Sequence, residues 1–149
     1  MRMPTLALAL VFSPLALLGC TSNPASYRPV PGASQGRVYE GDEGYQREVT
    51  TNSREAQRFF DQGMQLLYGF NHDEAIRSFE EAAAIDPECA MAYWGIAYAN
   101  GININDPAMS ETRNRQAYAA AQEALRRSDD ETPVEKALIG AVAERYAYP

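Results

Sequence analysis

The chain has 149 residues, of which 46% are hydrophobic and 22% charged, an ordinary composition for a soluble globular domain. Its 13 basic and 20 acidic residues give a formal net charge of −7. Because phosphate groups and anionic lipid headgroups repel an acidic surface, we expect no binding to nucleic acid and no docking on anionic headgroups.

The N-terminal end of the chain indicates an export signal. Arg2 gives it a positive start, and residues 6–18 are an apolar run too short to cross a bilayer as a helix. The motif LLGC at residues 17–20 resembles the lipobox of bacterial lipoproteins, in which the leader is cut before the cysteine and the cysteine is acylated. The resemblance implies a signal peptide over residues 1–19 and a mature N-terminus at Cys20, anchored to a membrane by acyl chains such as palmitate. The alternative is an ordinary secretory signal with a cysteine near its cleavage site.

The residue after Cys20 bears on the destination of the protein. In Gram-negative lipoproteins an Asp at this position commonly marks retention at the inner membrane, whereas this chain has Thr21. The lipoprotein resemblance therefore implies the bacterial cell envelope and favours the periplasmic side of the outer membrane.

Residues 20–51 predict a tether. This segment is rich in Pro, Gly and Ser and shows neither helical nor strand periodicity, so we expect a disordered, flexible chain with a reach on the order of 30 Å. Three tyrosines lie within it, Tyr27, Tyr39 and Tyr45. They either dock onto the folded part of the chain or are solvated, and we expect them to be solvated.

Residues 59–87 have the pattern of two antiparallel helices. We predict helices over residues 59–68 and 72–85, which approach closely because Gly63 on the first and Ala75 on the second are small. The larger residues of the seam between them are Phe59, Leu66, Ile76 and Phe79. The pattern therefore predicts a helical hairpin.

The ends of both helices carry local signals. Two pairs have the spacing of a capping box with Asn in the cap position: Asn52 with Glu55, and Asn71 with Glu74. Gly69 tolerates the left-handed conformation that commonly ends a helix, so we expect that conformation there. The Asp86-Pro87 step stops the second helix, because proline disfavours helical geometry in the residue before it.

These landmarks resemble the tetratricopeptide repeat, a helix-turn-helix unit of about 34 residues with the pattern W-x2-L-G-x2-Y, then A-x3-F, then P. The residues in matching register are Phe59, Gln62, Gly63, Leu66, Ala75, Phe79, Ala82 and Pro87. Gln62 stands where the repeat has an apolar residue. The resemblance implies an all-α fold in which antiparallel helical hairpins stack as a short solenoid. It also implies that partner peptides bind along the concave surface lined by the first helix of each hairpin.

The resemblance assigns residues 52–149 to one repeat domain. Its expected units are 56–89, which matches best, an extended second unit over 90–131, and an incomplete third unit over 132–149. Such arrays are stabilised by stacking and usually end in a capping helix. The missing second helix of the third unit therefore predicts a truncated chain or a module completed by a partner.

Two signals predict helices in the later units. The Asp-Pro step at residues 106–107 predicts the start of a helix that runs to about residue 127. The stretch Thr-Pro-Val-Glu at residues 132–135 is a capping box with proline at the first helical position. It predicts a helix over residues 133–146.

Few residues offer catalytic chemistry. His72, the single histidine, lies at a predicted helix start, and no set of His, Cys, Asp and Glu has the spacing of metal ligands. No glycine-rich phosphate loop and no serine-nucleophile motif occurs. We expect Cys89 to fill a buried space rather than to react. We therefore expect no enzyme activity, no metal, no cofactor and no small-molecule substrate.

One stripe of side chains is the candidate binding surface. Its members recur at helical spacing on the predicted first helices: Gln57, Phe60, Met64, Tyr68, Met91, Trp94 and Tyr98. The tetratricopeptide resemblance places them on the concave surface. An apolar, aromatic face without Lys, Arg or Asn favours an apolar helix or extended segment of a partner over an acidic terminus. The alternative is that the next helices or the tether cover these residues, which then belong to the core.

Together these features predict a non-catalytic, lipid-anchored protein-protein interaction scaffold of the bacterial cell envelope. Two alternatives are open. The chain is the N-terminal part of a longer envelope enzyme or transport-assembly component whose chemistry lies beyond Pro149, or it is a purely structural envelope lipoprotein.

Overall fold

The computed structural model describes residues 27, 37–39 and 44–148, and this part of the chain is all-helical, as predicted. It contains five α-helices and one short 3₁₀ helix, with no strand among the described residues. Their bounds are α1 (Arg54–Tyr68), α2 (His72–Ile85), α3 (Ala90–Ala99), α4 (Glu111–Arg126), η1 (Ser128–Asp130) and α5 (Pro133–Ala143). The predicted signal peptide, Cys20 and much of the predicted tether lie outside the described residues.

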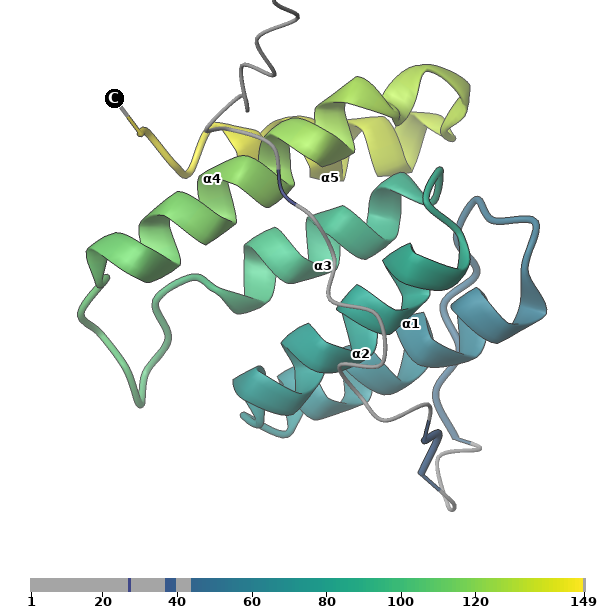
Figure 1. Ribbon diagram of the computed structural model, residues 1–149, viewed down its shortest axis with the longest axis horizontal. Helices are drawn as coiled ribbons and strands as arrows, with labels where there is room; N and C mark the ends of the chain where they lie inside the picture. The colour runs from purple at the N-terminus through teal and green to yellow at the C-terminus, as the bar shows by residue number, and fades with distance from the viewer. Residues whose placement is uncertain (1–26, 28–36, 40–43, 149) are drawn as a thin grey trace, which may run out of the picture.

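Neighbouring helices pack in the order of the chain. α1 packs on α2, α2 on α3, α3 on α4 and α4 on α5, while α3 also contacts α1 and α5. Figure 1 shows α3 in the middle, with α1 and α2 on one side and α4 and α5 on the other. This central position explains why α3 is apolar all round rather than on one face. Within the described residues, no helix combines the length and the hydropathy that crossing a membrane requires.

Phe79 of α2 lies where three helices meet. Its side chain is fully buried, and a Cβ atom added to Gly63 of α1 or to Gly95 of α3 would lie 2.6 Å from the ring. Phe60 packs against the same ring, with 5.5 Å between the centroids. The two glycines therefore allow α1 and α3 to close around one aromatic side chain.

The start of α1 differs from the prediction. Ser53, not Asn52, is the N-cap, and its Oγ accepts a hydrogen bond from the Ala56 N–H at 3.2 Å. The Asn52 backbone N–H donates instead to Asp86 Oδ2 at 3.3 Å. The predicted capping role of Asn52 is therefore wrong, because Asn52 is one residue too early, and α1 begins at Arg54 rather than at residue 59.

The turn between α1 and α2 also differs in detail. Phe70 has a φ of 59°, whereas Gly69 has a φ of −80°, so the left-handed residue lies one position later than predicted. The Phe70 N–H donates to Leu67 O at 3.1 Å and the Asn71 N–H to Leu66 O at 2.9 Å, the usual pattern after a left-handed helix end. Asn71 is the N-cap of α2, but its side chain makes no capping hydrogen bond, so the capping box predicted there is wrong.

The predicted helix start at Asp106 is wrong. The Asp106 N–H donates to Asn103 O at 3.2 Å and the Asn103 N–H to Asp106 O at 3.0 Å, which closes a tight turn. α4 begins only after Ser110, whose Oγ accepts from the Arg113 N–H at 3.2 Å. A real cap further along the chain therefore replaces the predicted one.

Two other helix boundaries are confirmed. Thr132 Oγ1 accepts from the Glu135 N–H at 3.3 Å, and the Glu135 carboxylate accepts from the Thr132 N–H at 3.0 Å, which is the predicted capping box. Pro133 occupies the first turn of α5. Asp86 ends α2 as expected, and its N–H donates to Ala82 O at 2.9 Å.

Extended chain precedes α1, and we name residues 44–51 the strap (Figure 1). Every second strap residue is half-buried and those between are exposed; the half-buried ones are Tyr45, Arg47, Val49 and Thr51. Among the described residues before α1, four side chains pack against the core: Tyr27, Val38, Tyr45 and Val49. The expectation of solvated tyrosines is therefore wrong for Tyr27 and Tyr45, whereas Tyr39 is 42% exposed.

Candidate functional site

Gln57 on α1 holds the strap by its side-chain amide. Its Oε1 accepts a hydrogen bond from the Val49 N–H at 3.1 Å, and its Nε2 donates to Arg47 O at 2.8 Å. One carboxamide thus pairs with both a donor and an acceptor of the strap backbone, as a neighbouring β-strand does. Asp61, one turn further along α1, accepts from the Arg47 N–H at 2.9 Å. The strap is therefore held through its backbone.

Gln62, five residues further along α1, makes the same kind of pairing with residues 37 and 39. Its Oε1 accepts from the Tyr39 N–H at 2.6 Å, and its Nε2 donates to Arg37 O at 3.2 Å and to Ser78 Oγ at 3.0 Å. Gln62 is only 1% exposed, so its amide needs these partners. Gln62 stands at an apolar position of the repeat pattern because its buried amide binds backbone groups of residues 37 and 39 and the Ser78 hydroxyl.

The C-terminal end of the strap is tied to α5. The backbone N–H and the Oγ1 of Thr50 donate to the two carboxylate oxygens of Glu135 at 2.7 and 2.8 Å. The same carboxylate completes the capping box of α5. The strap therefore bridges α1 and the first turn of α5.

A second carboxyl group, Glu131, lies beside this tie. Its side chain is 6% exposed, and its Oε2 has no hydrogen-bond partner in the described part of the chain. Burial raises the pKa of Glu131 to about 7, and the charge of Glu135 adds to the rise. Burial by itself also raises the pKa of Glu135, but hydrogen bonds from Thr132 and Thr50 outweigh it and lower that pKa. Glu131 therefore keeps its proton to a higher pH than an ordinary carboxyl group does, whereas Glu135 is the ionised partner.

Tyr27 makes a further contact between the N-terminal segment and α2. Its hydroxyl donates a hydrogen bond to the Glu80 carboxylate. Burial, reinforced by this bond, raises the pKa of Tyr27 above its ordinary value, and burial raises the pKa of Glu80. The hydroxyl therefore keeps its proton and donates it in a hydrogen bond to the Glu80 carboxylate.

Four residues of the predicted stripe lie inside the molecule. Phe60, Met64 and Met91 are at most 1% exposed, and Trp94 is 7% exposed. The Trp94 indole N–H donates to Leu138 O at 3.1 Å, so α5 covers this side chain. For these four the structure agrees with the alternative interpretation, in which neighbouring segments cover the stripe.

The other three residues of the stripe are accessible to different degrees. Gln57 is half-buried under the strap, whereas Tyr68 is 64% and Tyr98 41% exposed. Tyr45 of the strap packs edge-on against Tyr68, with 6.0 Å between ring centroids. Tyr98 stacks on Trp94 at 5.2 Å. The stripe therefore reaches the surface at its two tyrosines, on α1 and α3.

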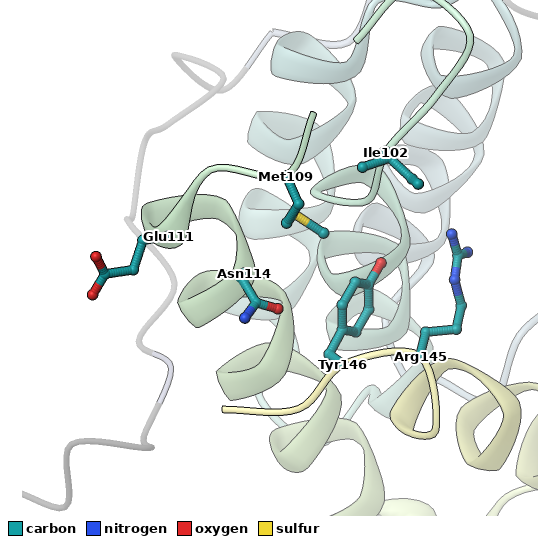
Figure 2. A pocket seen from close by; sticks show the side chains of 6 residues that line it. All are labelled: Ile102, Met109, Glu111, Asn114, Arg145 and Tyr146. Carbon is teal, nitrogen blue, oxygen red and sulfur yellow. The ribbon is translucent and has the colours of Figure 1, made fainter. Parts of the chain in front are cut away.

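A pocket of about 630 Å³ lies near Tyr98, between the α3–α4 loop and the end of α5. Its lining is Ile102, Met109, Glu111, Asn114, Arg145 and Tyr146. Figure 2 shows Ile102, Met109 and Tyr146 around its centre, with Arg145 on one side and Glu111 pointing away. The Tyr146 hydroxyl donates to Ala97 O at 2.9 Å and fixes this wall. The pocket therefore combines an apolar centre with polar groups at the rim.

Sequence reasoning missed Arg145. Its guanidinium lies 5.1 Å from the ring centroid of Tyr98 and 5.7 Å from that of Tyr146. This places a cation on the aromatic surface that was expected to lack one. The residue follows the end of α5, and only the packing of α5 on α3 brings it to Tyr98, so no local signal marks it.

The side chains that could act in catalysis or bind a metal, among them His72 and Cys89, lie in surroundings that favour a structural role. Within the described residues no group of three or more His, Cys, Asp and Glu side chains is arranged to hold a metal ion. The His72 ring lies 6.2 Å from that of Phe70. Cys89 is 1% exposed, as predicted, and burial raises the pKa of its thiol to about 12, so it is protonated at neutral pH.

Fold and surface together define an all-helical module that holds an extended segment of its own chain along its first helix. Comparison with known proteins found no matching protein family, no matching curated protein and no matching solved structure. The tetratricopeptide resemblance therefore depends on the residues of this chain alone.

Proposed function

We propose that this chain is a non-catalytic protein-protein interaction scaffold, held by a lipid anchor in the bacterial cell envelope. The observation that supports it best is the pairing of Gln57 with the strap backbone. A helix that holds one extended segment through backbone groups has the chemistry to bind another. The partner in this proposal is a protein or peptide.

The helical part is a short tetratricopeptide-like solenoid in this proposal. α1 with α2 corresponds to the unit at 56–89, α3 with α4 to the unit at 90–131, and α5 opens the third. The packing order supports this assignment, because α3 contacts the first helices on both sides, α1 and α5. The close contact of Gly63 with Phe79 lies at positions that match the repeat pattern.

The accessible end of the stripe is the surface that a partner meets. Tyr68 and Tyr98 are exposed aromatic residues, a type enriched at protein interfaces, and the pocket beside Tyr98 suits an apolar side chain. Arg145 adds hydrogen-bond donors at the rim. The buried members of the stripe support this surface from beneath.

Photo-crosslinking in intact cells tests the scaffold. A crosslinking residue replaces Tyr98, and the control replaces Leu125, which is 38% exposed on α4, away from the stripe. We expect one dominant envelope protein captured from position 98 only, with a lower yield when Tyr68→Ala or Arg145→Ala is added. No specific adduct from a folded variant, or equal capture from both positions, contradicts the proposal.

The lipid anchor has its own test. In the proposal the leader over residues 1–19 is removed, Cys20 is acylated, and the mature protein lies on the periplasmic side of the outer membrane. We expect Cys20→Ser to accumulate as an uncleaved, unacylated precursor, and the wild type to follow outer-membrane markers on a density gradient. Normal processing of Cys20→Ser contradicts the lipidation.

A further inference from the structure

We propose that the edge of α1 formed by Gln57 and Asp61 is a binding site for an extended peptide with an aromatic, a basic and a β-branched residue at alternate positions. The strap occupies this site as an internal competitor. The inference rests on the proposed function in one respect, that the competing ligand is a segment of a partner protein.

The backbone part of the site accepts any extended segment of suitable length. Gln57 satisfies the Val49 N–H and the Arg47 carbonyl, and Asp61 satisfies the Arg47 N–H. These contacts give affinity without selecting a sequence, as in peptides that add a strand to a sheet edge.

The side-chain part of the site selects every second residue. Tyr45 meets the ring of Tyr68, Val49 packs against the core, and the Arg47 side chain is half-buried between them. Asp61 and Glu135 present carboxylates to this segment. An acidic edge favours a ligand with a basic residue and disfavours an acidic one.

The fit of the strap is incomplete, which makes it replaceable. Arg47 Nε is buried and has no hydrogen-bond acceptor in the described part of the chain. Tyr68 stays 64% exposed although Tyr45 packs on it. A partner segment whose own basic side chain finds an acceptor, or that covers more of Tyr68, therefore competes with the strap.

A fluorescent peptide of strap sequence, GYQREVTT, provides the test. Its binding is measured by anisotropy to the full-length wild type and to the full-length double variant Tyr45→Ala/Val49→Ala, which weakens the strap and leaves the site intact. We expect the double variant to bind the peptide about tenfold or more tightly than the wild type, because its internal competitor is weaker. A control peptide, GQYERTVT, has the same composition with neighbouring residues exchanged. We expect it to bind at least about tenfold more weakly, because its apolar residues face outward.

A charge substitution shows where the peptide binds. Gln57→Glu in the double variant replaces the Nε2 donor by a carboxylate oxygen that repels the peptide carbonyl, and we expect peptide binding to be lost. Gln116→Glu, an exposed position on α4, makes the same chemical change elsewhere and should leave binding unchanged. Circular dichroism checks that each variant is folded, and Tyr45→Ala alone replaces the double variant if helicity is lost.

The results separate this inference from the proposed function. A folded double variant that binds neither peptide, or both equally, overturns the inference, as does a wild type that binds as tightly as the variant. The crosslink from position 98 does not involve the strap. If the crosslink succeeds and the peptide does not bind, the protein is a scaffold without this peptide site. If the peptide binds and the crosslink fails, the edge of α1 is a peptide-binding site and position 98 is not an interface.

Discussion

Gly63 and Gly95 leave room for the Phe79 ring, and any residue with a Cβ atom at either position would occupy that room. A Cβ at either position would lie 2.6 Å from ring atoms of Phe79, which no real contact tolerates without movement. The ring is fully buried between helices, so it has little room to move. Two residues without side chains thus determine how closely α1, α2 and α3 pack.

We predict that Gly95→Ala destabilises the protein although alanine favours helix. Overpacking against Phe79 should reduce the free energy of unfolding by about 1–3 kcal/mol, measured by urea denaturation. The matched control is Gly140→Ala in α5, where an added Cβ meets nothing within 4 Å. There the gain in helix propensity should raise the free energy of unfolding by up to about 1 kcal/mol. Equal effects at the two positions would show that the Phe79 contact is not tight.

Gln62 shows what single residues reveal before a structure is known. Its register identified it as a polar residue in an apolar position, but its partners, Ser78 and the backbone at Arg37 and Tyr39, are distant in sequence. A lone glutamine carries no sign of which chain segment it will meet. The sequence therefore shows that Gln62 departs from the repeat pattern, but it does not show which backbone groups Gln62 binds.

Among the elements, α3 and α5 are joined through Trp94. The indole is 7% exposed and its N–H donates to Leu138 O at 3.1 Å. The sequence pattern favoured Trp94 as a surface anchor, since it lies at stripe spacing on a first helix. The helix that covers it begins more than thirty residues later, at Pro133, so local spacing does not show the covering.

We predict that Trp94→Ala lowers the free energy of unfolding by about 3–5 kcal/mol, as for other buried aromatic truncations. Trp94→Phe keeps a smaller aromatic ring and removes the hydrogen bond to Leu138 O, so it should lose about 1–3 kcal/mol. Tyr98→Ala, at the exposed end of the same helix, is the control and should lose less than either. A Trp94→Ala protein as stable as the wild type would show that Trp94 is a surface residue and not part of the core.

Helix boundaries differ in how well local sequence predicts them. The capping box at Thr132 and the proline after Asp86 act within a few residues, and both boundaries are where they were predicted. Asn52, Gly69 and Asp106 are also favourable end residues, yet Ser53, Phe70 and Ser110 take these roles instead. Several adjacent residues with similar preferences leave the choice to packing and hydrogen bonds that only the folded chain supplies.

For the whole molecule, the pair of Glu131 and Glu135 makes stability depend on pH. Burial and the neighbouring carboxylate raise the pKa of Glu131 to about 7 in the folded protein, whereas the unfolded chain has the ordinary value near 4.5. Between these values the folded state binds a proton that the unfolded state has released. The contribution of Glu131 to stability therefore falls as pH rises from about 4.5 to about 7.

We predict that Glu131→Gln becomes more stable relative to wild type as pH rises. The difference in free energy of unfolding between the two proteins should change by about 1–3 kcal/mol between pH 4.5 and pH 8, measured by urea denaturation. Glu88→Gln, at an exposed position in the α2–α3 loop, controls for the loss of one acid. A constant difference across this range for Glu131→Gln would show that folding does not raise the pKa of Glu131.

The overall class was predictable and the role of the N-terminal segment was not. Helical periodicity and the spacing of glycine, alanine and phenylalanine predicted an all-α chain, because the pattern of an amphipathic helix is contained within its own residues. In the strap, half-buried and exposed residues alternate, but the only apolar residues are Tyr45 and Val49. Because the half-buried residue between them is the charged Arg47, the sequence does not show the alternation of apolar and polar residues that is typical of a half-buried extended segment. A segment rich in polar residues and glycine therefore looks like a free tether although it is held by the helices.

The hydrogen bonds between Thr50 and Glu135 join residues 85 positions apart. Because a ribosome delivers the chain from the N-terminus at about 5–20 residues per second, Thr50 emerges roughly 4–17 s before its partner. During that interval the strap lacks its tie to α5, and at this end it is held by the hydrogen bond from Thr51 Oγ1 to Asp86 Oδ2. Closure of this long loop therefore requires α5, and a nascent chain that stalls before α5 lacks both hydrogen bonds from Thr50 to Glu135.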